Sequence, residues 1–265
     1  MQSRKLVAQT LVCELLFRLS DSGCAISLIE SMQTENRTQP SATERSLSAE
    51  IKLYYDLQMA APAPAPLLIG LHGYGAGKRQ MMREAQAIVP EGFAIASLQG
   101  PHQHLKDPKE AGGALRFGFG WLTNFRPEES VAVHHQALLN LIGSLTADGV
   151  ADPGRIFLVG FSQSCALNYR FAFTHPQVLR GVIGICGGMP GDWNTSEIYQ
   201  RTAAAAFHLS GELDEFYPPA RTNDYLAQLR MRASDVQYRS YDAGHEIVQP
   251  MRDDLRSWLT QKAIV

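Results

Sequence analysis

A serine between two small residues is the first feature of this sequence that could perform chemistry. Ser162 stands in the pentapeptide Gly-Phe-Ser-Gln-Ser of residues 160–164, with an apolar run before it and a helical pattern after it. A nucleophilic serine is held in such a sharp strand-to-helix turn, and the strained turn requires small residues two positions before and after it. Gly160 meets this requirement, and Ser164 occupies the position where glycine is usual. We therefore expect Ser162 to be a nucleophile in a slightly altered turn.

A serine nucleophile needs a base to take its proton and an acid to orient that base. Asp214 follows a predicted strand, in a loop that contains Gly211, and Glu212 and Glu215 are nearby alternatives to it. His245 comes directly after the last predicted strand. The order serine, acid, histidine is the one found in hydrolases built on a mostly parallel sheet. The sequence therefore predicts a triad of Ser162, Asp214 and His245.

Acyl transfer also needs backbone N–H groups to stabilise the oxyanion of the tetrahedral intermediate. The amide after the nucleophile, that of Gln163, is one candidate donor. The second is expected in the loop after an earlier strand, where Gly73 and Gly75 let the backbone approach closely, and Tyr74 N–H is the candidate there. We expect His72 to hold this loop by a hydrogen bond and not to take part in the chemistry.

The elements that must position these residues alternate along the chain. The predicted strands are residues 51–57, 67–72, 93–98, 156–159, 179–185, 203–209 and 236–241, and the predicted helices are residues 78–89, 131–145, 165–173, 219–231 and 245–263. Such alternation indicates an α/β fold, a mostly parallel sheet with helices on both faces, and binding sites at the carboxyl ends of its strands. Residues 99–129 show little regular pattern, so we expect a long functional loop. His134 and His135 are expected on the surface of a helix.

Composition limits the classes of protein that remain. The 265 residues suit one large α/β domain, and the net charge of −2 gives no reason to expect a nucleic-acid partner. The four cysteines are scattered without a C-x-x-C pair, so neither a disulfide framework nor a metal site is expected, and a cytoplasmic location fits. Buried, inert thiols are expected for Cys165 and Cys186.

The N-terminal part differs in character from the rest. Residues 6–19 form an amphipathic helical stripe, and residues 32–49 have the polar composition of a flexible linker. We therefore divide the chain into a helical extension with linker at 1–49 and a catalytic domain at 50–265. A membrane partner is not favoured, although an interfacial helix is an alternative for the stripe. A start at Met32 stays open as well.

Four motifs together resemble one protein family. They are Leu-His-Gly-Tyr-Gly at 71–75, Gly-Phe-Ser-Gln-Ser at 160–164, Gly-Glu-Leu-Asp at 211–214 with Pro218, and Gly-His at 244–245. In this order, over about residues 50 to 262, they resemble the phospholipase/carboxylesterase family, which includes acyl-protein thioesterases and small bacterial carboxylesterases. The resemblance implies the α/β-hydrolase fold, the predicted triad and oxyanion donors, and no cofactor. It also implies that Trp121 is a wall of the substrate pocket.

The function expected from the sequence is a serine hydrolase that cleaves a small-molecule carboxylic ester or thioester. Trp121 and Phe119 are the candidate substrate-binding residues, and Phe117 and Phe125 are further candidates for the acyl pocket. Alternatives are a lysophospholipase or acyl-protein thioesterase, a dienelactone-hydrolase-like enzyme, and a catalytically silent fold that serves as a binding module. Dienelactone hydrolases use cysteine where this sequence has Ser162. The sequence is compatible with a homodimer but does not determine the oligomeric state.

Overall fold

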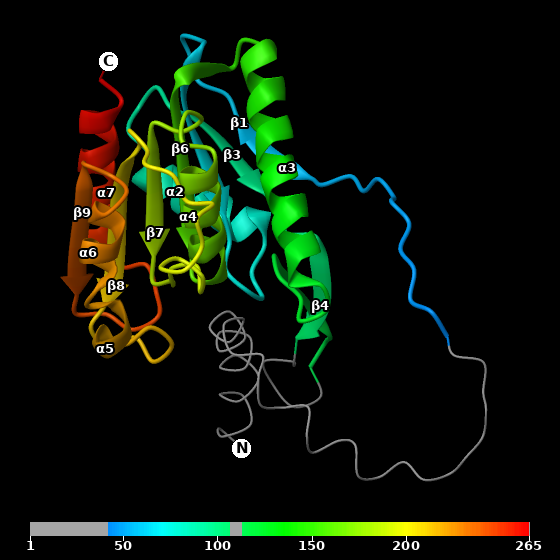
Figure 1. Cartoon of the computed structure of the whole chain (residues 1–265). Coiled ribbons are helices and arrows are strands. Elements are labelled where there is room, and N and C mark those ends of the chain that lie inside the picture. Colours follow the sequence, from blue (N-terminus) through cyan, green and yellow to red (C-terminus); the bar gives the residue numbers. More distant parts are fainter. Residues whose placement is uncertain (1–41, 107–112, 265) are drawn as a thin grey trace.

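The structure is a computed structural model, and it describes residues 42–106 and 113–264 (Figure 1). The helix predicted within residues 6–19 lies outside the described residues. Residues 42–54 form an extended, mostly exposed segment that leads into the first strand of the sheet. No helix in the described ranges is both long and apolar enough to cross a membrane.

A seven-stranded sheet forms the centre of the molecule. Its strands, in spatial order, are β1 (Tyr55–Gln58), β3 (Ala94–Leu98), β2 (Ala65–Leu71), β6 (Ala151–Phe161), β7 (Gly181–Ile185), β8 (Ala205–Gly211) and β9 (Val236–Tyr241). β1 pairs with β3 in antiparallel orientation, and all the other pairs are parallel. Side chains on β2, β3, β7 and β8 are buried almost without exception, which explains why these strands appear in the sequence as continuous apolar runs.

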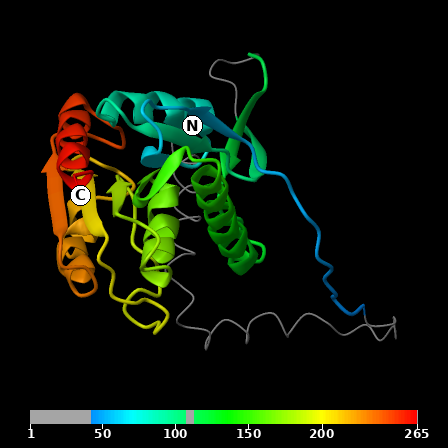
Figure 2. The same ribbon diagram turned by 90° about the horizontal axis from the view of Figure 1, so that it is seen from above.

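Helices cover both faces of the sheet. They are α2 (Lys78–Ile88), α3 (Pro127–Ala147), α4 (Gln163–Thr174), α5 (Pro219–Thr222), α6 (Tyr225–Arg230) and α7 (Gln249–Lys262). One apolar core lies between the sheet and α2 with α7, and the other lies between the sheet and α3, α4 and α6. Viewed from above, α2 and α7 lie on one side of the sheet and α3 and α4 on the other (Figure 2). The three-layer α/β-hydrolase fold predicted from the sequence is confirmed.

Two expectations about local structure were wrong. Residues 99–129 are not an irregular loop, because β4 (His102–Lys106) and β5 (Arg116–Gly120) form an antiparallel hairpin within them. The hairpin is a separate two-stranded sheet, so its strands lack the apolar runs of the main sheet. The helix expected over 219–231 is two short helices, α5 and α6, separated by Asn223 and Asp224, residues whose side chains compete with helical backbone hydrogen bonds.

The expected surface position of His134 was also wrong. Its side chain is 1% exposed and lies on the buried face of α3 with Leu138, Leu141 and Leu145. These residues follow His134 at intervals of four, seven and eleven positions, which places all four on one helical face. His135 is half-buried.

Candidate active site

The turn after β6 has the strained backbone that the sequence predicts. Ser162 has φ 57° and ψ −115°, and it lies between the end of β6 and the start of α4. Its N–H donates to the carbonyl oxygen of Ile185, so the turn is tied to the neighbouring strand β7. A Cβ at Gly160 would meet Ser164 Oγ at 2.8 Å and Asn168 Nδ2 at 2.6 Å, which explains the need for glycine there.

The structure brings the three predicted triad side chains into one hydrogen-bonded chain. Ser162 Oγ lies 2.9 Å from His245 Nε2, and His245 Nδ1 lies 2.9 Å from Asp214 Oδ2. Ser162 follows β6, Asp214 follows β8 and His245 follows β9, so the carboxyl ends of three parallel strands supply one residue each. With the Nδ1 proton donated to the carboxylate, Nε2 is free to accept the proton of the serine hydroxyl.

Asp214 is buried, and both of its carboxylate oxygens accept hydrogen bonds. Its Oδ1 accepts the backbone N–H groups of Phe216 and Tyr217, each at 2.9 Å, while Oδ2 accepts from His245. Burial opposes ionisation, but the hydrogen bonds from His245, Tyr217 and Phe216 outweigh it, and the pKa of Asp214 lies below its usual value. The carboxylate is therefore charged at neutral pH and orients the imidazole.

The competing carboxylates lie elsewhere. Glu212 and Glu215 are exposed, and Glu212 accepts a hydrogen bond from Ser240 Oγ. The ring of His245 packs between Phe161 and Phe216, with centroid distances of 4.9 and 4.8 Å. Of the three acidic residues near β8, the structure thus brings Asp214 alone to the histidine.

The loop after β2, residues 72–77, is held by side chains from several other elements. The carbonyl oxygen of Leu71 accepts a hydrogen bond from Ser164 Oγ at 2.9 Å, and that of His72 accepts from Trp121 Nε1 at 2.8 Å. The carbonyl oxygen of Gly73 accepts from His72 Nδ1 at 2.8 Å. Three consecutive carbonyl groups are therefore fixed by three different side chains, and the peptides between them are fixed as well.

His72 is a neutral positioning residue, as the sequence analysis expected. Burial lowers its pKa to about 4, although its hydrogen bond to Gly73 acts in the opposite direction. Its Nε2 accepts the N–H of Gly100 at 3.0 Å, so the ring proton is on Nδ1 and is donated to the Gly73 carbonyl. Because a peptide unit is planar, holding the Gly73 carbonyl also sets the direction of Tyr74 N–H.

The hairpin supports the same loop from the other side. Ala76 and Phe119 form an isolated bridge, and Gly75 N–H donates to the Phe119 carbonyl at 2.8 Å. Lys106 Nζ donates to the Gly75 carbonyl at 2.9 Å. The ring of Tyr74 is partly exposed and stacks on His104 at 4.3 Å. The β4–β5 hairpin, which was expected from the sequence to be part of a long loop, thus supports the loop that carries the candidate oxyanion donor.

The two predicted oxyanion donors belong to different parts of the chain: Gln163 begins α4, and Tyr74 lies in the loop after β2. Gln163 N–H is the first amide of α4, where a helix has no internal acceptor for it. Within the described part of the chain, neither Gln163 N–H nor Tyr74 N–H has a hydrogen-bond acceptor. Both amides are therefore available to a charged oxygen, and their role as oxyanion donors stays a prediction.

The predicted pocket residues differ from one another in exposure. Trp121 is 0% exposed, so it does not fit the expected role of a pocket wall; its indole is packed beneath the loop and holds the His72 carbonyl. Phe119 is half-buried on β5, and its role stays a prediction. Phe117 and Phe125 are largely exposed.

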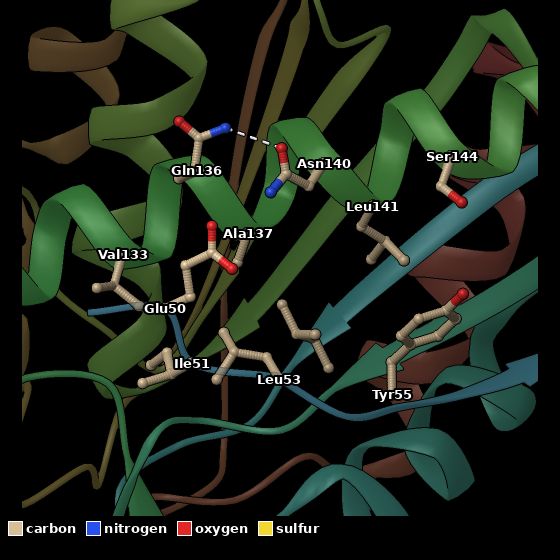
Figure 3. A pocket seen from close by; sticks show the side chains of 11 residues that line it. Glu50, Ile51, Leu53, Tyr55, Val133, Gln136, Ala137, Asn140, Leu141 and Ser144 are labelled. Atoms are coloured by element: carbon tan, nitrogen blue, oxygen red, sulfur yellow. Dashed lines mark hydrogen bonds between the residues drawn. The ribbon is translucent and has the colours of Figure 1, made fainter. Parts of the chain in front are cut away.

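Two cavities lie in different parts of the molecule. One of about 290 Å³ borders His245 and is lined in part by Gln80, Glu84, Glu246 and Arg252. Another of about 620 Å³ lies between α3 and the extended segment before β1, and Figure 3 shows Glu50, Leu53 and Leu141 along its walls. The second cavity is larger, but no triad residue lines it, whereas His245 lines the 290 Å³ cavity.

Other reactive groups are buried or dispersed. Cys165 and Cys186 are free buried thiols, as predicted, and burial raises the pKa of both, that of Cys186 to about 12. Across residues 42–106 and 113–264 there is no group of three or more His, Cys, Asp or Glu side chains that could hold a metal ion.

Sequence reasoning missed the roles of Ser164 and Lys106. Ser164 was expected to be a tolerated replacement for glycine, but its hydroxyl contacts the backbone of both β2 and β6. Lys106 is the last residue of β4, and no pattern around it in the sequence indicated a contact with Gly75. Only the unusual serine in the nucleophile turn was a signal that could have been followed.

Comparisons with known proteins identify relatives of this chain. The chain is 27% identical over 134 residues to NocK of Nocardia uniformis subsp. tsuyamanensis, a protein named as an esterase; the match covers 49% of this chain and 35% of NocK. The curated relatives that it matches are longer, and the chain spans about a third of their length.

Solved structures share the fold at low sequence identity. The Bacillus cereus carboxylesterase superposes with a TM-score of 0.64 at 16% identity, over 79% of this chain and 94% of that one. The Zea mays acyl-protein thioesterase 2 gives 0.60 at 17% identity, over 79% and 99%. The family model described as phospholipase/carboxylesterase matches residues 56–262. Since this match covers most of the sequence, the chain belongs to the phospholipase/carboxylesterase family.

Proposed function

We propose that this protein is a serine hydrolase that cleaves carboxylic esters or thioesters through an acyl-enzyme intermediate. The observation that carries the proposal is the continuous hydrogen-bonded chain from Ser162 through His245 to the buried carboxylate of Asp214. The family to which the chain belongs supports the same activity. The catalytic domain of the proposal spans residues 50–265, and the family match over 56–262 supports these bounds.

Acylation begins at the serine hydroxyl. Ser162 Oγ forms a bond to the carbonyl carbon of the substrate while His245 Nε2 takes its proton, and Asp214 stabilises the imidazolium that results. The carbonyl oxygen becomes an oxyanion, which Tyr74 N–H and Gln163 N–H stabilise. When the intermediate collapses, the bond to the leaving alcohol or thiol breaks, and His245 returns the proton to that group.

Deacylation repeats these steps with water. A water molecule loses a proton to His245 and attacks the acyl carbon, and the oxyanion again lies at the two amides. Collapse of this intermediate releases the carboxylic acid, and Ser162 Oγ recovers its proton from His245. The cycle thus uses the chain's own side chains and amides together with one water molecule.

The expected substrates are of small or medium size. The cavity beside His245 measures about 290 Å³, which is near the lower limit for small-molecule sites. We expect p-nitrophenyl esters of short acyl chains to be hydrolysed faster than those of long chains. Phe119 is the proposed contact for the acyl group, because it is half-buried and pairs with the loop that carries Tyr74.

A cellular location and a partner are also proposed. Free thiols at Cys165 and Cys186 support a reducing compartment, and a cytoplasmic location is the one proposed. The proposed partner is the small-molecule ester or thioester itself.

The test is covalent labelling by a fluorophosphonate probe, followed by turnover of p-nitrophenyl esters. The wild-type protein should be labelled, because Ser162 Oγ bonds to the phosphorus of the probe and fluoride leaves it. Ser162→Ala should lose labelling and about 10⁶-fold in kcat. Ser97→Ala is the matched control, because Ser97 is buried on β3 and its hydroxyl donates to the Lys78 carbonyl. Folded wild-type protein that is neither labelled nor active would contradict the proposal and favour a silent binding module.

A further inference from the structure

Ser164, two positions after the nucleophile, is fully buried, and its hydroxyl forms hydrogen bonds with the backbone. Ser164 is 0% exposed, and its Oγ accepts the N–H of Phe161 at 3.0 Å. The same hydroxyl donates to the Leu71 carbonyl at 2.9 Å, with the Phe161 carbonyl at 3.1 Å as a second acceptor. One hydroxyl is thus within hydrogen-bonding distance of three backbone groups, as the acceptor from one and the donor towards the other two.

These three groups belong to the two strands that carry the site. Leu71 is the last residue of β2 and is followed by the loop with Tyr74, while Phe161 is the last residue of β6 and is followed by Ser162. The regular pairing of β2 with β6 ends at Leu71 and Gly160. The hydroxyl therefore adds one more link between the strands after their pairing has ended.

We infer that Ser164 is a positioning residue that holds the oxyanion loop in register with the nucleophile. The inference deepens the proposed function and rests on it. With Leu71 held to Phe161 through one hydroxyl, the distance between Ser162 and the amide of Tyr74 is constrained from both strand ends. The departure from glycine in the turn is then a functional replacement.

The usual glycine can be understood in the same terms. Without a side chain at this position, a water molecule can bind near the site of Oγ, where the Leu71 and Phe161 carbonyls and the Phe161 N–H offer three polar partners. Ser164 supplies this oxygen covalently. Alanine would be worse than either, because its methyl carbon lies too close to the position of Oγ for a water molecule to bind there and makes no hydrogen bond itself.

The experiment compares Ser164→Ala and Ser164→Gly with the wild-type protein and with Ser97→Ala. For Ser164→Ala we expect kcat to fall about 10- to 100-fold with KM changed by less than about threefold, as for small displacements of catalytic groups. Ser164→Gly should lie between alanine and serine in kcat. Helix propensity predicts the opposite order for stability, since alanine is preferred to glycine within a helix. Ser97→Ala should keep the wild-type kcat.

A second measurement separates positioning from a general loss of structure. The tetrahedral adduct of a trifluoromethyl ketone bears an oxyanion, so its inhibition constant should rise with the loss of kcat/KM in Ser164→Ala. An active wild type with an equally active Ser164→Ala variant, or with Ser164→Gly less active than Ser164→Ala, would overturn the inference. An inactive wild type would instead overturn the proposed function, so the two failures are distinguishable.

Discussion

Two regions meet at the carboxyl edge of the sheet, and they are built on opposite principles. In the triad, three side chains contact each other directly, and the backbone serves to place them. In the loop of residues 72–77, the groups proposed to act are backbone amides, and the side chains around them serve as supports. The first region depends on the chemical identity of a few residues. The second depends on geometry to which many residues contribute.

This difference determines how each region should respond to mutation. Removing a triad side chain removes a participant in the proposed reaction, so a large and specific loss of kcat is expected. Disturbing the loop leaves every participant present but moves one donor, so a smaller loss is expected, with substrate binding preserved. The Ser162→Ala and Ser164→Ala variants described above are the extreme and intermediate members of this series.

The largest remaining effect is expected at the acid of the triad. Asp214→Asn keeps the shape of the side chain but removes the charge that stabilises the imidazolium and selects its tautomer, so kcat should fall about 10⁴-fold. The measurement is steady-state hydrolysis of a p-nitrophenyl ester with the rate of fluorophosphonate labelling beside it. Glu212→Gln and Glu215→Gln are matched controls and should keep wild-type rates. Loss of activity in Glu215→Gln, with Asp214→Asn unaffected, would reassign the acid.

A smaller effect is expected when the loop is displaced without loss of any reactive group. A Cβ at Gly73 would lie 2.9 Å from Phe161 Cδ1 and 3.2 Å from Ser162 Cβ, so Gly73→Ala should push the loop away from the nucleophile. We expect kcat to fall about 10²- to 10³-fold, the range for loss of one oxyanion donor, with KM nearly unchanged. The fluorophosphonate should still label Ser162.

Gly143→Ala provides the matched glycine control for this experiment. Gly143 lies within α3, and beyond the neighbouring backbone of that helix a Cβ there would have no heavy atom of the described residues within 4 Å. The variant should keep wild-type kcat and gain about 0.5–1 kcal/mol in free energy of unfolding, because alanine is favoured over glycine in a helix. If Gly73→Ala were as active as Gly143→Ala, the loop would not supply an oxyanion donor.

The same contrast explains what the sequence could and could not predict. Ser162, Asp214 and His245 were identifiable because each residue type has a role in acyl transfer and each follows a predicted strand. The strands that flank them were also predictable, and Val236–Tyr241 was predicted with the bounds that the structure has. Continuous apolar runs and punctuating glycines are strong local signals.

The supports of the loop gave no such signal. Trp121 was interpreted as a pocket wall, and only its contact with the His72 carbonyl shows its place beneath the loop. The hairpin that supports the loop has two short strands that pair with each other. Such a hairpin depends on packing against the rest of the protein, which the local sequence pattern does not show. His134 was misplaced for a different reason, because its spacing from Leu138 and Leu141 was available in the sequence and a histidine was assumed to be exposed.

The smallest effect concerns the buried histidine of the loop, His72, and the stability of the protein at low pH. It allows His72 to be compared with buried histidines elsewhere in the fold. Burial lowers the pKa of His72 to about 4, whereas an unfolded histidine titrates near 6.5. As pH falls below 6.5 the unfolded chain binds the proton first, so the free energy of unfolding falls by about 1.4 kcal/mol per pH unit until about pH 4 for this one residue. His134, His135 and His208, whose pKa values burial also lowers, add to the slope with the same sign.

Replacing one of these histidines should therefore flatten the pH dependence by one proton. Urea unfolding between pH 4.5 and 7.5 should show this for His72→Gln and equally for His208→Gln, the matched control, whose ring lies on β8 and bonds Tyr169 Oη at 2.8 Å. The two variants should differ in kcat at pH 7.5. His72→Gln should lose about 10-fold because the Gly73 peptide is released, while His208→Gln keeps the wild-type rate. Equal activity of the two variants would mean that His72 is a buried histidine like the others, with no part in holding the amide of Tyr74.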